Sequence, residues 1–88
     1  MIEKEVQIHN RAGLHTRPAA LLVKMASKFK SEIYLNREGF TINAKSIIGV
    51  MTLAAEQGAI LTIRVKGIDE EEAINEIAVL IESGFGEM

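Results

Sequence analysis

The sequence predicts a two-layer α+β domain, in which a mostly antiparallel four-stranded sheet carries three helices on one face. Short segments of apolar alternation, typical of half-buried strands, interchange with segments of helical periodicity in the order β-α-β-β-α-β-α. The chain has 88 residues, of which 48% are hydrophobic and 25% charged. This length and composition predict a single domain over residues 1–88.

The first strand and helix are expected on either side of a loop. Residues 2–8 alternate between apolar and polar side chains and predict a strand. From about Thr16 to Phe29, apolar residues recur three and four positions apart, as on one face of a helix. Pro18 falls in the first turn, where its missing N–H costs nothing.

A hairpin follows. Residues 31–37 and 40–43 predict two short strands joined by a turn at Arg37-Glu38-Gly39. Alternation predicts that Phe40 and Ile42 of the second strand face the core.

The last third predicts a short helix, a strand and a longer helix. The short helix runs to about Leu53 with Ser46 as its N-cap, and residues 60–66 form the strand. Asp69 and Glu72 have the spacing of a capping box at the start of the last helix.

The segment 13–20, GLHTRPAA, is the most informative in the chain. His15 directly precedes the predicted helix, whose first N–H groups lack intrahelical partners and favour negative charge. The backbone N–H groups of Thr16 and Arg17 and the Arg17 guanidinium suit phosphate oxygens. A neutral imidazole is a competent nucleophile. We therefore expect His15 to accept a phosphoryl group and hold it briefly.

Charge is unevenly distributed, although the net charge is only −2. Residues 6–31 contain no acid, whereas no base follows Lys66. The basic part surrounds His15 and suits an acidic partner surface, although exposed helix faces often carry charge without any such role. The small basic set and the few aromatic residues argue against nucleic acid as a partner.

Several classes of protein are disfavoured. The chain has no cysteine, so a disulfide framework, a thiol nucleophile and a cysteine-ligated metal are excluded. His9 and His15 lack further ligands at metal-binding spacing, so we expect no metal and no cofactor, and a structural or solvated His9. The charged N-terminus and the absence of long apolar runs predict a cytoplasmic protein that does not insert into membranes.

Exposed apolar residues predict a docking surface. A short helix buries only one side, and Val50 and Leu53 are its better core candidates. The other apolar residues of this helix, together with residues of the first helix that lie off its core stripe, form an apolar patch with a basic rim beside His15. Such a patch is typical of a transient interface, unless these residues complete the core. This surface comprises Ala20, Leu21, Lys24, Ile47, Ile48 and Met51.

The segment 13–20 resembles the active-site motif of the HPr family, the histidine-containing phosphocarriers of the bacterial phosphoenolpyruvate-dependent phosphotransferase system. The segment 45–51, KSIIGVM, is similar to the regulatory serine segment of the family, and the resemblance covers essentially the whole chain. It implies an open-faced β-sandwich. It also implies that His15, attended by Arg17, receives the phosphoryl group on Nδ1 from phospho-Enzyme I and passes it to EIIA domains of the sugar system, as a reactant and not as an enzyme.

The resemblance also implies regulation at Ser46. In Gram-positive-type members an HPr kinase/phosphorylase modifies this serine, and the modified form serves carbon catabolite repression, with a transcriptional regulator as partner. A phosphate at this position would place negative charge on the basic side that acidic partners use.

Other functions stay open. Three alternatives to a sugar-system phosphocarrier remain. They are a nitrogen-branch phosphocarrier, a regulatory HPr-like module acting through Ser46, and a generic α+β ligand-binding or RNA-binding domain. In each case we expect a monomer.

Overall fold

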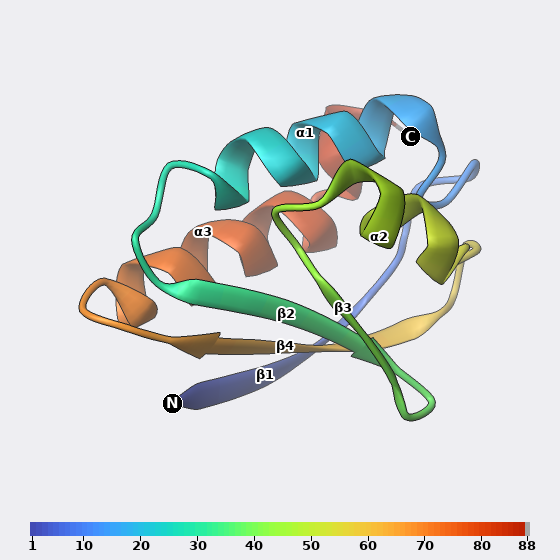
Figure 1. The fold of residues 1–88 in the computed structure, drawn as a ribbon. Coiled ribbons are helices and arrows are strands. Elements are labelled where there is room, and N and C mark those ends of the chain that lie inside the picture. Colours follow the sequence, from blue (N-terminus) through green and yellow to red (C-terminus); the bar gives the residue numbers. More distant parts are fainter. Residues whose placement is uncertain (88) are drawn as a thin grey trace.

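A computed structural model describes residues 1–87 and shows a sheet covered on one face by helices (Figure 1). The helices lie along one side of the sheet, and the other side is left open. The elements, in chain order, are β1 (Ile2–Gln7), α1 (Thr16–Ala26), β2 (Glu32–Arg37), β3 (Phe40–Asn43), α2 (Ile47–Leu53), β4 (Ile60–Lys66), α3 (Glu70–Glu82) and the 3₁₀ turn η1 (Gly84–Gly86).

The sheet has the strand order β1-β4-β2-β3. Every pairing is antiparallel, and Val65 of β4 lies between Ile2 of β1 and Ile33 of β2. The predicted two-layer α+β architecture is thus confirmed. The strand order needed the structure, because apolar alternation reports which face a residue occupies and not which strand lies beside it.

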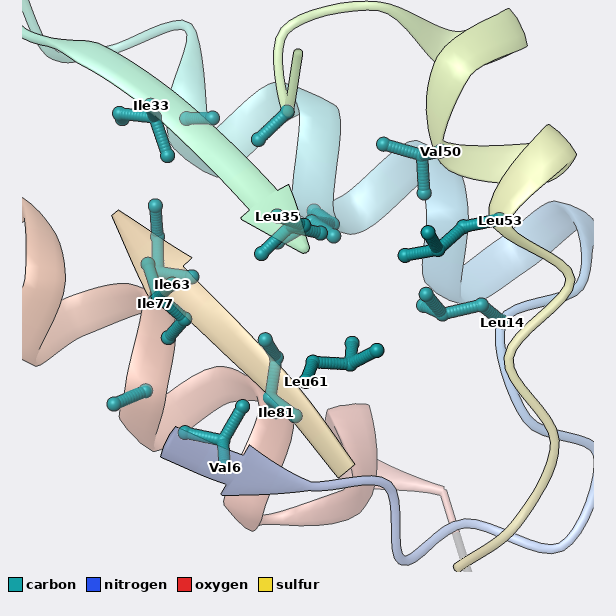
Figure 2. Close-up of a cluster of buried hydrophobic side chains, with 14 of the residues drawn as sticks. Val6, Leu14, Ile33, Leu35, Val50, Leu53, Leu61, Ile63, Ile77 and Ile81 are labelled. Carbon is teal, nitrogen blue, oxygen red and sulfur yellow. The ribbon is translucent and has the colours of Figure 1, made fainter. Parts of the chain in front are cut away.

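The core lies between the sheet and the helices, where the inward side chains of the strands meet the apolar stripes of the helices (Figure 2). Leu61 and Ile63 of β4 are fully buried, as are Val50 of α2 and Ile77 of α3. Leu14, one residue before His15, is buried in the same cluster. The core therefore anchors the segment that carries His15.

The prediction for Phe40 is wrong, since 51% of this residue is exposed. Ile42, two residues along the same strand, is buried as expected. Phe40 pairs with Arg37 at the turn end of the hairpin, on the edge strand β3. The turn end of the hairpin extends away from the helices (Figure 1), which agrees with the exposure of Phe40.

The predicted capping box is also wrong. Asp69 is the N-cap residue of α3 but makes no capping hydrogen bond. Its carboxylate instead accepts the N–H groups of Lys30 and Ser31, at 2.9 and 3.0 Å, and the Ser31 hydroxyl. Asp69 therefore ties the start of α3 to the start of β2, and Glu70 takes the Gly67 N–H at 3.0 Å.

Candidate functional site

His15 stands at the N-terminus of α1 with its ring partly exposed. Its backbone is extended, with φ −86° and ψ −164°, and its carbonyl oxygen accepts the Ala19 N–H at 2.9 Å. The side chain makes no capping hydrogen bond and is 49% exposed. The imidazole therefore projects from a fixed backbone and does not stabilise its own helix.

The next two residues leave backbone donors unpaired at the same place. Within residues 1–87, neither the Thr16 N–H nor the Arg17 N–H makes a hydrogen bond, and Pro18 has no N–H to pair. The Arg17 side chain is exposed and forms no ion pair with any described residue. A helix N-terminus of this kind favours an anion, because its N–H groups and its dipole act together.

The segment before His15 is held by the loop of residues 54–59. Leu14 donates its N–H to the Ala55 carbonyl oxygen at 2.9 Å, and Ile8 exchanges hydrogen bonds with Gly58 and Ala59 at 2.7 and 2.9 Å. Gly13 has φ 69°, and a Cβ there would overlap the Ala55 oxygen. This glycine is needed both for its conformation and for the close backbone approach.

A carboxylate from the other end of the chain lies beside the histidine. Glu87 Oε1 is 3.5 Å from His15 Nε2 and accepts from Asn10 Nδ2 at 3.1 Å. Asn10 is fully buried, and the same amide group donates to the Gly13 carbonyl oxygen at 2.8 Å. Sequence reasoning missed Asn10 and Glu87, because no spacing in the chain signals that a C-terminal residue folds over this loop.

His9 is paired as well. Its Nε2 lies 2.7 Å from Glu82 Oε1, and the Gln7 N–H donates to the other oxygen at 3.0 Å. The hydrogen bond from His9, followed by that from Gln7, lowers the pKa of Glu82. Of the two alternatives expected for His9, the structure shows the structural one. The residue connects the segment after β1 to the end of α3.

Ser46 is the N-cap of α2, as the sequence predicts. Its side-chain oxygen accepts the Gly49 N–H at 3.1 Å. The ammonium group of the neighbouring Lys45 is directed elsewhere and donates to the Phe29 carbonyl oxygen at 2.7 Å. Ser46 is an exposed residue and lies at a helix start.

The residues of the expected docking surface are exposed. Val50 and Leu53 of α2 are buried, whereas Ile48 is 76% exposed. Helices α1 and α2 contact one another, which brings the two parts of the patch to neighbouring elements. The exposed members are Ala20, Leu21, Lys24, Ile47, Ile48 and Met51, and we call them the α1/α2 surface.

The described residues contain no group of three or more side chains that could hold a metal ion. Within residues 1–87, no helix combines the length and apolar character that a membrane span requires.

Known proteins of one family are similar to this chain over nearly its whole length. A profile of the PTS HPr family, described as the PTS HPr component phosphorylation site, matches residues 2–83. The phosphocarrier protein HPr of Treponema pallidum is 48% identical over 87 residues, which cover 99% of this chain and 99% of the relative.

Solved structures agree. HPr-C-His from Thermoanaerobacter tengcongensis has a TM-score of 0.96 at 49% identity, covering 100% of this chain and 99% of the other. The catabolite repression protein Crh of Bacillus subtilis, described as a dimer with a swapping domain, has a TM-score of 0.77 at 38% identity, covering 96% and 97%.

The chain belongs to the HPr family of the phosphotransferase system. This membership supports a phosphocarrier role in that system, and the names of the relatives are consistent with a carrier that is not an enzyme. The fold is accordingly the open-faced β-sandwich of HPr.

Proposed function

We propose that this protein carries a phosphoryl group on His15. The observation that supports this most is the exposed imidazole at the N-terminus of α1, next to the unpaired N–H groups of Thr16 and Arg17. Phosphoryl transfer requires mainly positioning and charge stabilisation from a protein. The helix start and the Arg17 guanidinium supply both, because they meet the three anionic oxygens of a phosphohistidine.

Nδ1 is the proposed phosphorylated atom. Nε2 faces the Glu87 carboxylate at 3.5 Å, so a hydrogen on Nε2 is stabilised there. The lone pair of the neutral ring then lies on Nδ1, which does not face the carboxylate. A carboxylate that orients a histidine through its other ring nitrogen is a common device in proteins.

The proposed donor is phospho-Enzyme I, charged by phosphoenolpyruvate, and the proposed acceptors are EIIA domains of the sugar system. The α1/α2 surface supports this, because an exposed apolar patch beside the reactive group fits transient docking. Met51 adapts to more than one partner surface. A nitrogen-branch chain is the alternative end point, and the same surface serves either. We propose a cytoplasmic monomer that binds no nucleic acid.

Regulation at Ser46 is a second proposal. Ser46 is an exposed residue at the start of α2, directly before Ile47 of the α1/α2 surface, and phosphate is tolerated at a helix N-terminus. A kinase of the HPr kinase/phosphorylase type would add charge there, and a transcriptional regulator would be the reader. A purely regulatory module acting through Ser46 is the alternative function.

The carrier function is tested by following the phosphoryl group through two transfers. The protein is incubated with phosphoenolpyruvate and catalytic Enzyme I, separated from both, and then mixed with an EIIA domain. We expect the protein to gain one phosphoryl group and EIIA to receive it, while His15→Ala does neither. Transfer through the His15→Ala variant would contradict the proposal, as would a protein that never accepts phosphate from active Enzyme I.

A further inference from the structure

Helix α2 ends at a residue whose conformation its own side chain disfavours. Ala54 directly follows the helix with φ 51° and ψ 38°, in the left-handed region. A Cβ is strained there because it crowds a carbonyl oxygen, which is why glycine usually occupies such positions. Something outside the helix must therefore hold Ala54 in place.

The Arg37 side chain does so from the end of β2. Its Nη1 donates to the Ala54 carbonyl oxygen at 3.1 Å, and its Nη2 lies 2.6 Å from Glu56 Oε1. The Arg37 side chain as a whole is largely covered, with 21% of it exposed. A planar fork with two directed donors grips one short segment in a way that a lysine ammonium cannot.

The gripped segment holds the backbone before the histidine. Ala55, between the two residues that Arg37 binds, accepts the Leu14 N–H at 2.9 Å. The Ala55 oxygen is also the atom that a Cβ on Gly13 would overlap, so the two segments touch backbone to backbone. Any rotation at Ala54 therefore moves the acceptor that anchors Leu14.

We propose that Arg37 is a positioning residue for His15. It holds Ala54 left-handed and thereby fixes the Ala55 carbonyl that anchors Leu14 and the start of α1. A glycine at position 54 would adopt the left-handed conformation without strain. Arg37 stabilises the same conformation at an alanine through its hydrogen bond to Ala54 and its ion pair with Glu56. The effect on phosphoryl transfer rests on the proposed function, whereas the mechanical coupling does not.

The test is a double-mutant cycle with Arg37→Ala, Ala54→Gly and their combination. Arg64→Ala is the matched control, since Arg64 pairs with Glu3 at 2.8 Å between neighbouring strands. The first readout is hydrogen exchange of the Leu14 amide by NMR. The internal reference is the Ala73 amide of α3, which donates to the backbone carbonyl oxygen of Asp69 at 3.0 Å. The second is the rate of phosphorylation by phospho-Enzyme I.

We expect Arg37→Ala to accelerate Leu14 exchange relative to Ala73 by about five- to thirtyfold, the factor that corresponds to releasing one strained left-handed residue. The rate of phosphorylation should fall. Arg37→Lys should give rates between those of Arg37→Ala and those of the wild type in both readouts. In the Ala54→Gly background the same Arg37→Ala change should have little effect on either readout. Arg64→Ala should change neither.

Two results would overturn the proposal. One is a Leu14 exchange rate that Arg37→Ala leaves unchanged. The other is an effect of Arg37→Ala on Leu14 exchange that is equally large in the Ala54→Gly background. If the wild-type protein accepts no phosphate, the proposed function fails, and the exchange data still decide whether Arg37 anchors Leu14.

Discussion

Glu87 and His15 lie side by side, with Oε1 of the carboxylate 3.5 Å from Nε2 of the ring. The C-terminal segment thus reaches the N-terminus of α1, and the buried Asn10 amide holds the carboxylate there. The pair combines two opposing effects. The carboxylate attracts a hydrogen on Nε2, and its negative charge would oppose the charge of a phosphoryl group on His15.

Replacing this carboxylate by an amide should favour the phosphorylated form. We expect Glu87→Gln to raise the equilibrium constant for phosphorylation by about two- to fivefold at low salt, the range for an exposed charge pair. The gain should shrink at high salt, because ions screen the repulsion. Quantifying phosphoprotein at a set ratio of phosphoenolpyruvate to pyruvate measures it. Glu71→Gln, on an exposed residue of α3, is the control. An unchanged or lower constant would contradict this prediction, because the repulsion would then not exceed the attraction at Nε2.

Gly13 should tolerate no side chain, since its Cβ would overlap the Ala55 oxygen. Gly13→Ala should lower the free energy of unfolding by about 2 kcal/mol or more, combining backbone strain with the clash. Gly58→Ala is the matched control, because Gly58 has φ 91° but open space around it. Its cost should be about 1 kcal/mol, from strain alone. Urea titrations of both variants measure the difference, and equal losses would refute the close approach.

The α1/α2 surface should be needed for partner recognition and not for folding. Because Ile48 is 76% exposed, we expect Ile48→Glu to leave Tm nearly unchanged and to raise the KM for the protein as a substrate of Enzyme I about tenfold. Val79→Glu is the control, on an equally apolar residue of α3 that is 68% exposed. Equal effects of the two variants would mean that net charge, and not the α1/α2 surface, sets the KM.

Two substitutions at Ser46 separate its structural role from its proposed regulatory role. Ser46→Ala removes the acceptor of the Gly49 N–H and should cost about 1 kcal/mol of unfolding free energy. Ser46→Asp keeps a good N-cap, so stability should be retained. Its charge should nevertheless slow phosphorylation of His15 by Enzyme I. Thermal melts and phosphorylation rates measure both effects, and wild-type rates in Ser46→Asp would argue against regulation by charge.

Asp69 should make stability depend on acid. Its hydrogen bonds from the Ser31 hydroxyl, then from the Lys30 N–H, hold the pKa of the carboxyl below its usual range. A lowered folded-state pKa contributes stability that is present above the unfolded value of about 4 and is lost as the pH falls through the folded value. Asp69→Asn should therefore flatten the acid side of the stability profile. Urea midpoints between about pH 6 and pH 2 test this, and an unchanged slope would contradict it.

Local interactions were predictable from the sequence. The Ser46 cap needs only a neighbour three residues away, and the structure contains it. Asp69 shows the limit of this reasoning, because the same spacing argument failed when Ser31, from a distant segment, became its partner. Phe40 failed because alternation reports a face and not whether a helix covers it.

The residues around His15 divide in the same way. Its place before α1 follows from periodicity and from Pro18, and the structure confirms it. Arg37 and Glu87 were not predictable, because each acts on a segment far from it in sequence. Only the folded chain shows which distant side chains contact His15 and the loop beside it.

The most direct test of the central claim is the intact mass of the protein after incubation with phosphoenolpyruvate and purified Enzyme I, before and after brief acid treatment. Phosphohistidine is acid-labile, so the account predicts a gain of one phosphoryl group that acid removes, and no gain in His15→Ala. A phosphoryl group that survives acid, or one that His15→Ala still acquires, would contradict it.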